Sequence, residues 1–107
     1  MNYNVYIIAD AEEDIFSINK YVAINDSVQK AETLLGNIEE KISNLSELAN
    51  GGHIPPELER IGIYEYREIH FKPYRIIYQI IESDVYVHCV LDGRRDLEDL
   101  LQERLLR

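Results

Sequence analysis

Residues 64–97, YEYREIHFKPYRIIYQIIESDVYVHCVLDGRRDL, decide the fold of this chain. The segment contains three runs rich in β-branched and aromatic residues, separated by breaks of two or three residues: 64–71, 74–81 and 85–91. Such runs are typical of β-strands. Because breaks this short can join only antiparallel neighbours, we predict three consecutive antiparallel strands.

Two helices are predicted before these strands. After a short apolar run at residues 3–8, predicted as a first strand, apolar side chains recur every three or four residues, which places each set on one helical face: Ala11, Ile15, Ile18 and Val22, then Val28, Ala31, Leu35, Ile38, Ile42, Leu45 and Ala49. Asp10 with Glu13, and Asp26 with Gln29, are predicted to cap the two helices. Adjacent helices with a short link favour an antiparallel hairpin. A coiled-coil dimer is the alternative for the longer stripe, which covers only three heptads.

The remaining segments complete an α+β fold. Asn50-Gly51-Gly52 is predicted to end the second helix, and residues 51–62 to form a loop or a single turn. After Asp92-Gly93, leucines at helical spacing predict a final helix. The predicted order is β-α-α-β-β-β-α, a small, mostly antiparallel sheet packed against a helical hairpin. We expect residues 1–107 to form a single domain, because a chain of this length buries one core.

Composition limits the classes of function. The net charge of -9, from 11 basic and 20 acidic side chains, argues against nucleic-acid binding driven by phosphate neutralisation. The sequence shows neither a secretory signal nor an apolar run approaching the roughly 18 residues of a membrane span. Cys89 is the only cysteine, which excludes an internal disulfide and a four-cysteine metal site. We therefore expect a cytoplasmic protein that does not associate with membranes.

Arginines are the first candidates for function. Arg67 and Arg75 lie in strands that otherwise favour apolar residues. Because an unpaired buried guanidinium is costly, each must pair with a carboxylate or face a site; the candidate carboxylates are Glu65, Glu68 and Asp92. Arg94 and Arg95 follow the last strand, where a sheet commonly carries binding groups. The alternative for Arg95 is a local pair with Asp99.

Histidines are the second candidates. His53, His70 and His88 share no metal-ligand spacing, so no metal site is predicted. His70 and His88 lie on predicted strands, and either is a candidate general base if it reaches the arginines. A structural histidine is the commoner alternative. Cys89 alternates with hydrophobic neighbours and is predicted to be a buried core thiol. The sequence has no glycine-rich phosphate loop, metalloprotease helix or hydrolase elbow, and no cofactor is expected.

Three motifs resemble the C-terminal signature of the RelE/ParE toxin superfamily: Tyr66-Arg67-Glu68-Ile69, Pro73-Tyr74-Arg75-Ile76-Ile77-Tyr78, and Val90-Leu91-Asp92-Gly93-Arg94-Arg95-Asp96-Leu97. The preceding elements also follow the order of that superfamily, so the resemblance covers nearly the whole chain. It implies the toxin of a bacterial type II toxin-antitoxin system, associated with growth inhibition and plasmid stabilization. The implied partner is a cognate antitoxin that wraps the toxin, neutralises it and represses their shared operon.

The superfamily includes two kinds of toxin. RelE-like members cut mRNA in the ribosomal A site without a metal, whereas ParE-like members poison DNA gyrase. For RNA cleavage, the resemblance assigns Arg67, Arg75 and Arg95 to basic positions that hold the phosphate. The chain departs from that pattern at two places. Glu68 or Ile69 replaces a lysine, and the position of a helical tyrosine falls near Leu101.

We therefore predict a ParE-like gyrase inhibitor that acts by protein contact. The first alternative is a ribosome-dependent endoribonuclease, with His70 or His88 as the acid-base group. The second is a decayed toxin that serves mainly as an antitoxin partner. Arg94, Tyr74 and Tyr78 are candidate binding residues. Because strand 74–81 carries bulky side chains on both faces, exposed apolar surface is expected to be available to the antitoxin.

Overall fold

The computed structural model describes residues 2–106 and has the predicted α+β order. Its elements are β1 (Asn4–Ile7), α1 (Ala9–Asn25), α2 (Val28–Ser43), α3 (Leu45–Leu48), the 3-10 turn η1 (Ala49–Gly51), α4 (Pro56–Glu59), β2 (Tyr66–Phe71), β3 (Tyr74–Ile81), β4 (Asp84–Asp92) and α5 (Glu98–Leu105). The sheet has the order β1-β4-β3-β2. Strands β2, β3 and β4 are antiparallel neighbours, as predicted, and β1 runs parallel to β4.

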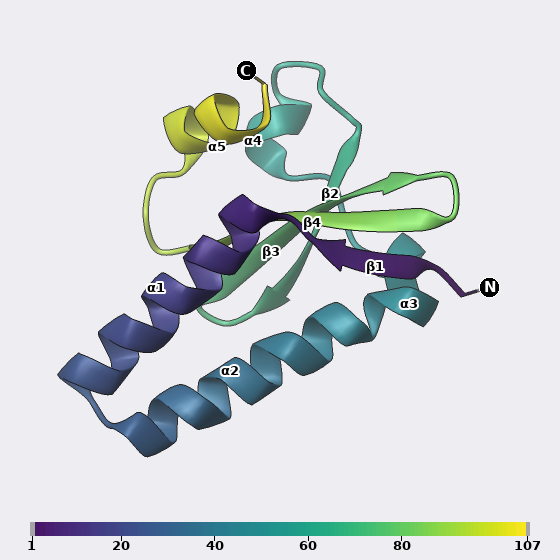
Figure 1. Cartoon of the computed structure of the whole chain (residues 1–107). Helices are drawn as coiled ribbons and strands as arrows, with labels where there is room; N and C mark the ends of the chain where they lie inside the picture. The colour runs from purple at the N-terminus through teal and green to yellow at the C-terminus, as the bar shows by residue number, and fades with distance from the viewer. Residues whose placement is uncertain (1, 107) are drawn as a thin grey trace.

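Helices cover both faces of the sheet (Figure 1). The hairpin face, packed against α1, α2 and α3, buries side chains that include Ile38, Ile76 and Tyr78. The opposite face, which we call the α4–α5 face, buries another cluster that includes Leu58, Ile77 and Leu101. The expectation of exposed apolar surface on β3 is therefore wrong for its central residues, because helices cover them on both sides.

The helical hairpin forms within the chain. Helices α1 and α2 pack against each other, and Ala31, Ile38 and Ile42 of the longer stripe are buried in the protein's own core. A coiled-coil dimer through this stripe would need the same side chains, so the hairpin prediction holds. The predicted long helix is interrupted at Asn44, after which α3 begins, and Leu45 remains buried.

Both predicted caps are wrong by one or two residues. Helix α1 begins at Ala9, so Asp10 lies within its first turn. There a carboxylate interacts favourably with the helix dipole but does not cap the helix. Asp26 ends α1 instead of starting α2. The Ser27 hydroxyl accepts the hydrogen bond from the Lys30 backbone N–H at 3.0 Å and caps α2. The two-residue link gives Asp26 and Ser27 one role each.

A β-bulge in β4 changes which side chains face each way. Ile77 pairs with Cys89 but Tyr78 pairs with Val87, so His88 is the extra residue. As a result, Val87 belongs to the hairpin face, whereas Cys89 belongs to the α4–α5 face. The predicted burial of Cys89 is confirmed, since none of its surface is exposed.

Gly52 is required by packing as well as by helix termination. A side-chain carbon at this position would collide with the Tyr78 hydroxyl and would lie 2.8 Å from the Glu68 carbonyl oxygen. The Tyr78 hydroxyl donates to the Ala49 carbonyl at 2.6 Å, which holds the start of the 3-10 turn against the sheet. No helix within residues 2–106 combines the length and hydrophobicity needed to cross a bilayer.

Candidate functional site

The two strand arginines point to opposite faces of the sheet. Arg67 pairs across the strands with Tyr78, a residue of the hairpin face, and donates to the Gly52 carbonyl at 2.9 Å. Arg75 pairs across the strands with His70 and contacts Glu68 on the α4–α5 side. Because neighbouring residues of a strand alternate between faces, the sheet separates these two guanidinium groups. None of the carboxylates proposed from the sequence binds Arg67.

Arg75 is held by two carboxylates. Its Nε and Nη2 donate to the two oxygens of Glu68 at 2.6 and 2.9 Å. Its Nη1 and Nη2 donate to the two oxygens of Glu57 at 2.6 and 2.8 Å. The Glu68 partner was among the sequence candidates. Glu57 was not, because it comes from α4 and reaches Arg75 only through tertiary packing.

This double pairing shifts the pKa values of Glu57 and Arg75. Hydrogen bonding to Arg75 lowers the pKa of Glu57, against an opposing effect of burial. The hydrogen bonds that Arg75 donates to Glu57, and then to Glu68, raise the pKa of Arg75. The Arg75 side chain is only 14% exposed. Arg75 is therefore a permanently charged, largely buried group whose donors are already directed at protein carboxylates.

His53 and His70 join this network through Glu68. The His70 Nε2 lies 3.0 Å from Glu68 Oε1, and the His53 Nε2 lies 3.3 Å from Glu68 Oε2. The two rings contact each other edge-on at a centroid distance of 5.2 Å. His70 thus meets Arg75 only through a shared carboxylate oxygen. Histidine spacing in the sequence gave no indication of this group, because a backbone bridge between His53 and Glu68 creates it.

His88 lies elsewhere, at the bulge of β4. Its Nε2 is 3.2 Å from the Gln79 side-chain oxygen, and its ring contacts Tyr66 edge-on. Burial, followed by the charge of Arg104, lowers the pKa of His88. Its carbonyl accepts a hydrogen bond from Arg104 Nη2 at 3.1 Å. The arginine that His88 approaches is therefore Arg104, which was not among the predicted site residues.

Arg104 forms an ion pair with Asp14 that was not predicted from the sequence. Its Nη1 and Nη2 donate to the two oxygens of Asp14 at 3.1 and 2.9 Å, linking α5 to α1. Asp14 also accepts the Val90 backbone N–H at 3.0 Å, which compensates for the bulge in β4. A signal was present in the sequence. Asp14 is three residues after Ala11 and Arg104 is three after Leu101, so each charge interrupts an apolar helical face.

Arg94 and Arg95 lie beyond β4. Arg94 pairs locally with Asp92, at 3.0 Å from Nε and 2.7 Å from Nη2, and these contacts lower the pKa of Asp92 to about 2. Arg95 is exposed, and its backbone N–H donates to the Asp92 carbonyl at 3.3 Å. Among the described residues, no ion pair joins Arg95 to Asp99. Of the three arginines assigned to phosphate binding, Arg95 is the one with an exposed side chain.

The predicted aromatic binding residues are mostly covered. Tyr78 is fully buried and Tyr74 is 8% exposed, and burial raises the pKa of both hydroxyls. Leu101, at the position of the helical tyrosine in RelE-like toxins, is fully buried in the α4–α5 core. Cys89 is equally buried, and desolvation raises the pKa of its thiol to about 12. These side chains fill the core and do not line a surface.

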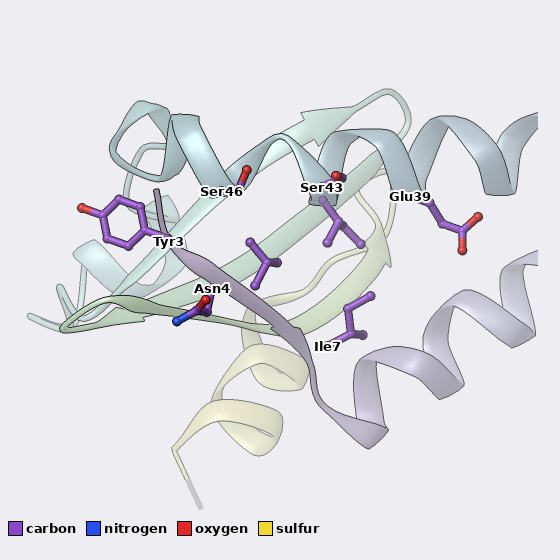
Figure 2. A pocket seen from close by; sticks show the side chains of 8 residues that line it. Tyr3, Asn4, Ile7, Glu39, Ser43 and Ser46 are labelled. Atoms are coloured by element: carbon purple, nitrogen blue, oxygen red, sulfur yellow. The ribbon is translucent and has the colours of Figure 1, made fainter. Parts of the chain in front are cut away.

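A surface hollow with no arginine in its lining lies between β1 and α2 (Figure 2). Tyr3, Asn4 and Ile7 line one side, and Glu39 and Ser43 line the other. Glu39 is the one carboxylate in this lining. A lone carboxylate beside apolar and hydroxyl groups provides neither a nucleophile-base pair nor a set of phosphate donors.

Two solved structures share the fold. The chromosomal ParDE TA system from P. aeruginosa aligns with a TM-score of 0.69 at 16% sequence identity, covering 82% of this chain and 92% of that chain. The RelBE2 toxin-antitoxin complex from Mycobacterium tuberculosis aligns with a TM-score of 0.62 at 17% identity, covering 84% of this chain and 96% of that chain. At these identities the likeness concerns the fold alone. The predicted RelE/ParE-like architecture is confirmed.

A family model supplies the more specific assignment. The model described as the ParE toxin of the type II toxin-antitoxin system, parDE, matches residues 5–97. The chain therefore belongs to the ParE toxin family and is the toxin of a type II toxin-antitoxin system. A comparison with curated protein sequences found no match. The resemblance seen in the C-terminal motifs is confirmed at the level of the superfamily.

Proposed function

We propose that this toxin inhibits DNA gyrase by protein-protein contact and catalyses no reaction. The observation that carries the proposal is the separation of Arg67 from Arg75 by the sheet. A ribonuclease of this superfamily needs its basic groups directed at one phosphate, since such groups act by stabilising the charge that develops there. In this chain, Arg67 lies on the hairpin face of the sheet and Arg75 on the α4–α5 face.

The environment of Arg75 supports the same proposal. All three guanidinium nitrogens donate to Glu57 or Glu68. A phosphate could bind Arg75 only by displacing a carboxylate, and Glu68, whose side chain is 1% exposed, would then lose its cation inside the protein. Leaving a buried charge without its partner is strongly unfavourable. The net charge of -9 also disfavours docking on ribosomal RNA.

Exposed apolar side chains support a mechanism based on protein contact. Near the turn of the hairpin, Tyr21, Ile24 and Val28 are each more than 60% exposed. Phe16, nearer the N-terminus of α1, is similarly exposed. Large exposed hydrophobic groups are typical of surfaces that bind other proteins. We also propose a cognate antitoxin as the cellular partner, because both structural neighbours are described as toxin-antitoxin assemblies.

A supercoiling assay tests the proposal directly. Purified toxin is titrated into gyrase, relaxed plasmid and ATP, and we expect supercoiling to be lost as toxin approaches a molar excess over gyrase. The matched variant is Arg95→Gln, because Arg95 is exposed and makes no ion pair with another described residue. Growth arrest by Arg95→Gln should equal that of the wild type if gyrase is the target.

Two outcomes would contradict the proposal. If supercoiling is unaffected at excess toxin, and primer extension on translated mRNA shows A-site cuts that disappear in Arg95→Gln, the toxin is a ribonuclease. If expression without an antitoxin leaves bacterial growth normal, the toxin activity has decayed. Arg75→Ala is unsuitable for this comparison, because it also removes the counter-ion of two carboxylates.

A further inference from the structure

Backbone pairing brings three metal-ligand side chains together on the α4–α5 side of the sheet. His53, in the loop before α4, forms an isolated antiparallel bridge with Glu68, with backbone hydrogen bonds of 3.1 and 2.7 Å in the two directions. Directly opposed residues project their side chains to the same side. His70 follows Glu68 by two residues and therefore faces the same way. The two histidines thus flank one carboxylate.

The distances between these side chains are compatible with three ligands around one ion. His53 Nε2 and His70 Nε2 lie 3.3 and 3.0 Å from the two Glu68 oxygens, and one potential ligand atom from each residue lies within 4.8 Å of the others. Zinc binds histidine nitrogen and carboxylate oxygen at about 2.0 to 2.2 Å, which gives neighbouring ligands of a tetrahedron a separation of about 3.3 Å. We propose that His53, Glu68 and His70 bind a divalent transition metal, with zinc the best-matched ion.

Electrostatics favour a cation at this position. Glu57 and Glu68 carry two negative charges, and Arg75, which binds both, supplies one positive charge. With neutral imidazoles, the network of Glu57, Glu68 and Arg75 has a net charge of about -1, and its Glu68 carboxylate is almost fully buried. A bound cation would compensate this negative charge. Arg75 does not block the site. It occupies one lone pair on each Glu68 oxygen, and each oxygen has a second.

Arg75 has the role of an orienting group in this site. Carboxylates that bind metals are commonly fixed by further hydrogen bonds, which hold them in the geometry that the metal needs. The bidentate contact with Arg75 fixes Glu68 in this way. The backbone bridge does the same for His53. Two of the three ligands are therefore positioned before a metal binds, which lowers the entropic cost of binding.

The ligand set indicates the kind of ion. Two imidazoles and one carboxylate suit zinc and related transition metals, whereas calcium and magnesium favour oxygen ligands alone. The histidine side chains are 59% and 41% exposed, so the fourth position of a tetrahedral ion would face solvent and hold water. A bound ion would tie the loop at His53 to β2. The site is independent of the proposed action on gyrase.

Metal titration of the purified full-length chain tests the proposal. The protein, free of any affinity tag, is stripped with a chelator and titrated with zinc by calorimetry at neutral pH, and with cobalt by visible absorption. We expect one ion per chain. His53→Gln and His70→Gln should each weaken binding by at least the roughly 10–100-fold that is typical for loss of an outer-shell partner. His88→Gln, which removes the third histidine outside the group, should bind as the wild type does.

A second readout separates binding at this group from binding elsewhere. Zinc should raise the thermal midpoint of the wild type and of His88→Gln, because an ion that binds only the folded state stabilises it. The midpoint of His53→Gln and His70→Gln should not respond. Absence of saturable binding to the wild type would overturn the proposal. Equal affinities in the wild type and both cluster variants would overturn it as well.

Discussion

Replacing Arg75 with methionine should destabilise the protein strongly. Methionine keeps an apolar stem where the Arg75 side chain packs beside Gly93, so the change removes mainly the guanidinium. Four hydrogen bonds to Glu57 and Glu68 are lost. Glu57, 16% exposed, can rotate toward water, but Glu68 cannot leave the interior. We therefore expect the lower end of the 3–5 kcal/mol range for breaking a buried pair, about 3 kcal/mol.

The measurement is urea unfolding followed by circular dichroism, with a thermal scan in parallel. A loss of about 3 kcal/mol corresponds to a fall of roughly 12–24 °C in Tm for a domain of this size. Adding Glu68→Gln to Arg75→Met should recover part of the loss, because it removes the unpaired charge. Arg94→Met is the matched control, since Arg94 pairs with Asp92 at the exposed surface. A loss below about 1 kcal/mol for Arg75→Met, or no recovery with Glu68→Gln, would refute the reasoning.

Four further outcomes follow from the same contacts. Gly52→Ala should cost more than 1 kcal/mol in urea unfolding, whereas Gly51→Ala, with open space around it, should be nearly neutral. Asp14→Ala should cost about 3 kcal/mol, because it leaves Arg104 without its carboxylate and the Val90 N–H without its acceptor; an unchanged urea midpoint would contradict this. Cys89 should resist a thiol reagent at pH 8 when folded and react in urea, since its pKa is raised to about 12 and it is fully buried. The pKa of Glu57 is lowered from 4.5, so the ionised carboxylate stabilises the folded protein above that pH, and this stabilisation is lost as the pH falls through the lowered value. The difference in unfolding free energy between the wild type and Glu57→Gln should therefore narrow on acidification from about pH 7. A constant difference would argue against the pairing with Arg75.

Local patterns predicted the elements of the fold because the relevant forces act over short sequence distances. The two-residue break at Lys72-Pro73 allowed β2 and β3 to be paired, and their register follows from it. The apolar spacing through Ile38 and Ile42 identified the buried side of the long helix. The cap of α1 was misplaced because this helix begins after Ile8 without a side-chain cap, and the cap of α2 was misplaced because Asp26 and Ser27 are adjacent candidates. Only the backbone geometry selects Ser27 over Asp26.

The candidate site was less predictable because its contacts join distant segments. The sequence identified Arg75 and one partner, Glu68, since both lie on neighbouring strands. Glu57 lies in the four-residue helix α4 and His53 in the loop before it, and neither segment is long enough to show a periodic pattern that would place a side chain. The bulge at His88 could not be predicted from a local pattern either. It changes which face the following residues occupy, and strict alternation along β4 cannot anticipate it.

The role of Arg75 also changes how the superfamily motif is interpreted in this chain. The motif Pro73-Tyr74-Arg75 is intact, yet Arg75 directs its donors to Glu57 and Glu68 instead of solvent. The lysine expected next to Arg67 is absent, and the neighbouring Glu68 is the residue that binds Arg75. The carboxylate of Glu68 therefore holds Arg75 in an internal ion network. Because an Arg75 substitution also destabilises the fold, catalysis is better tested at the exposed Arg95.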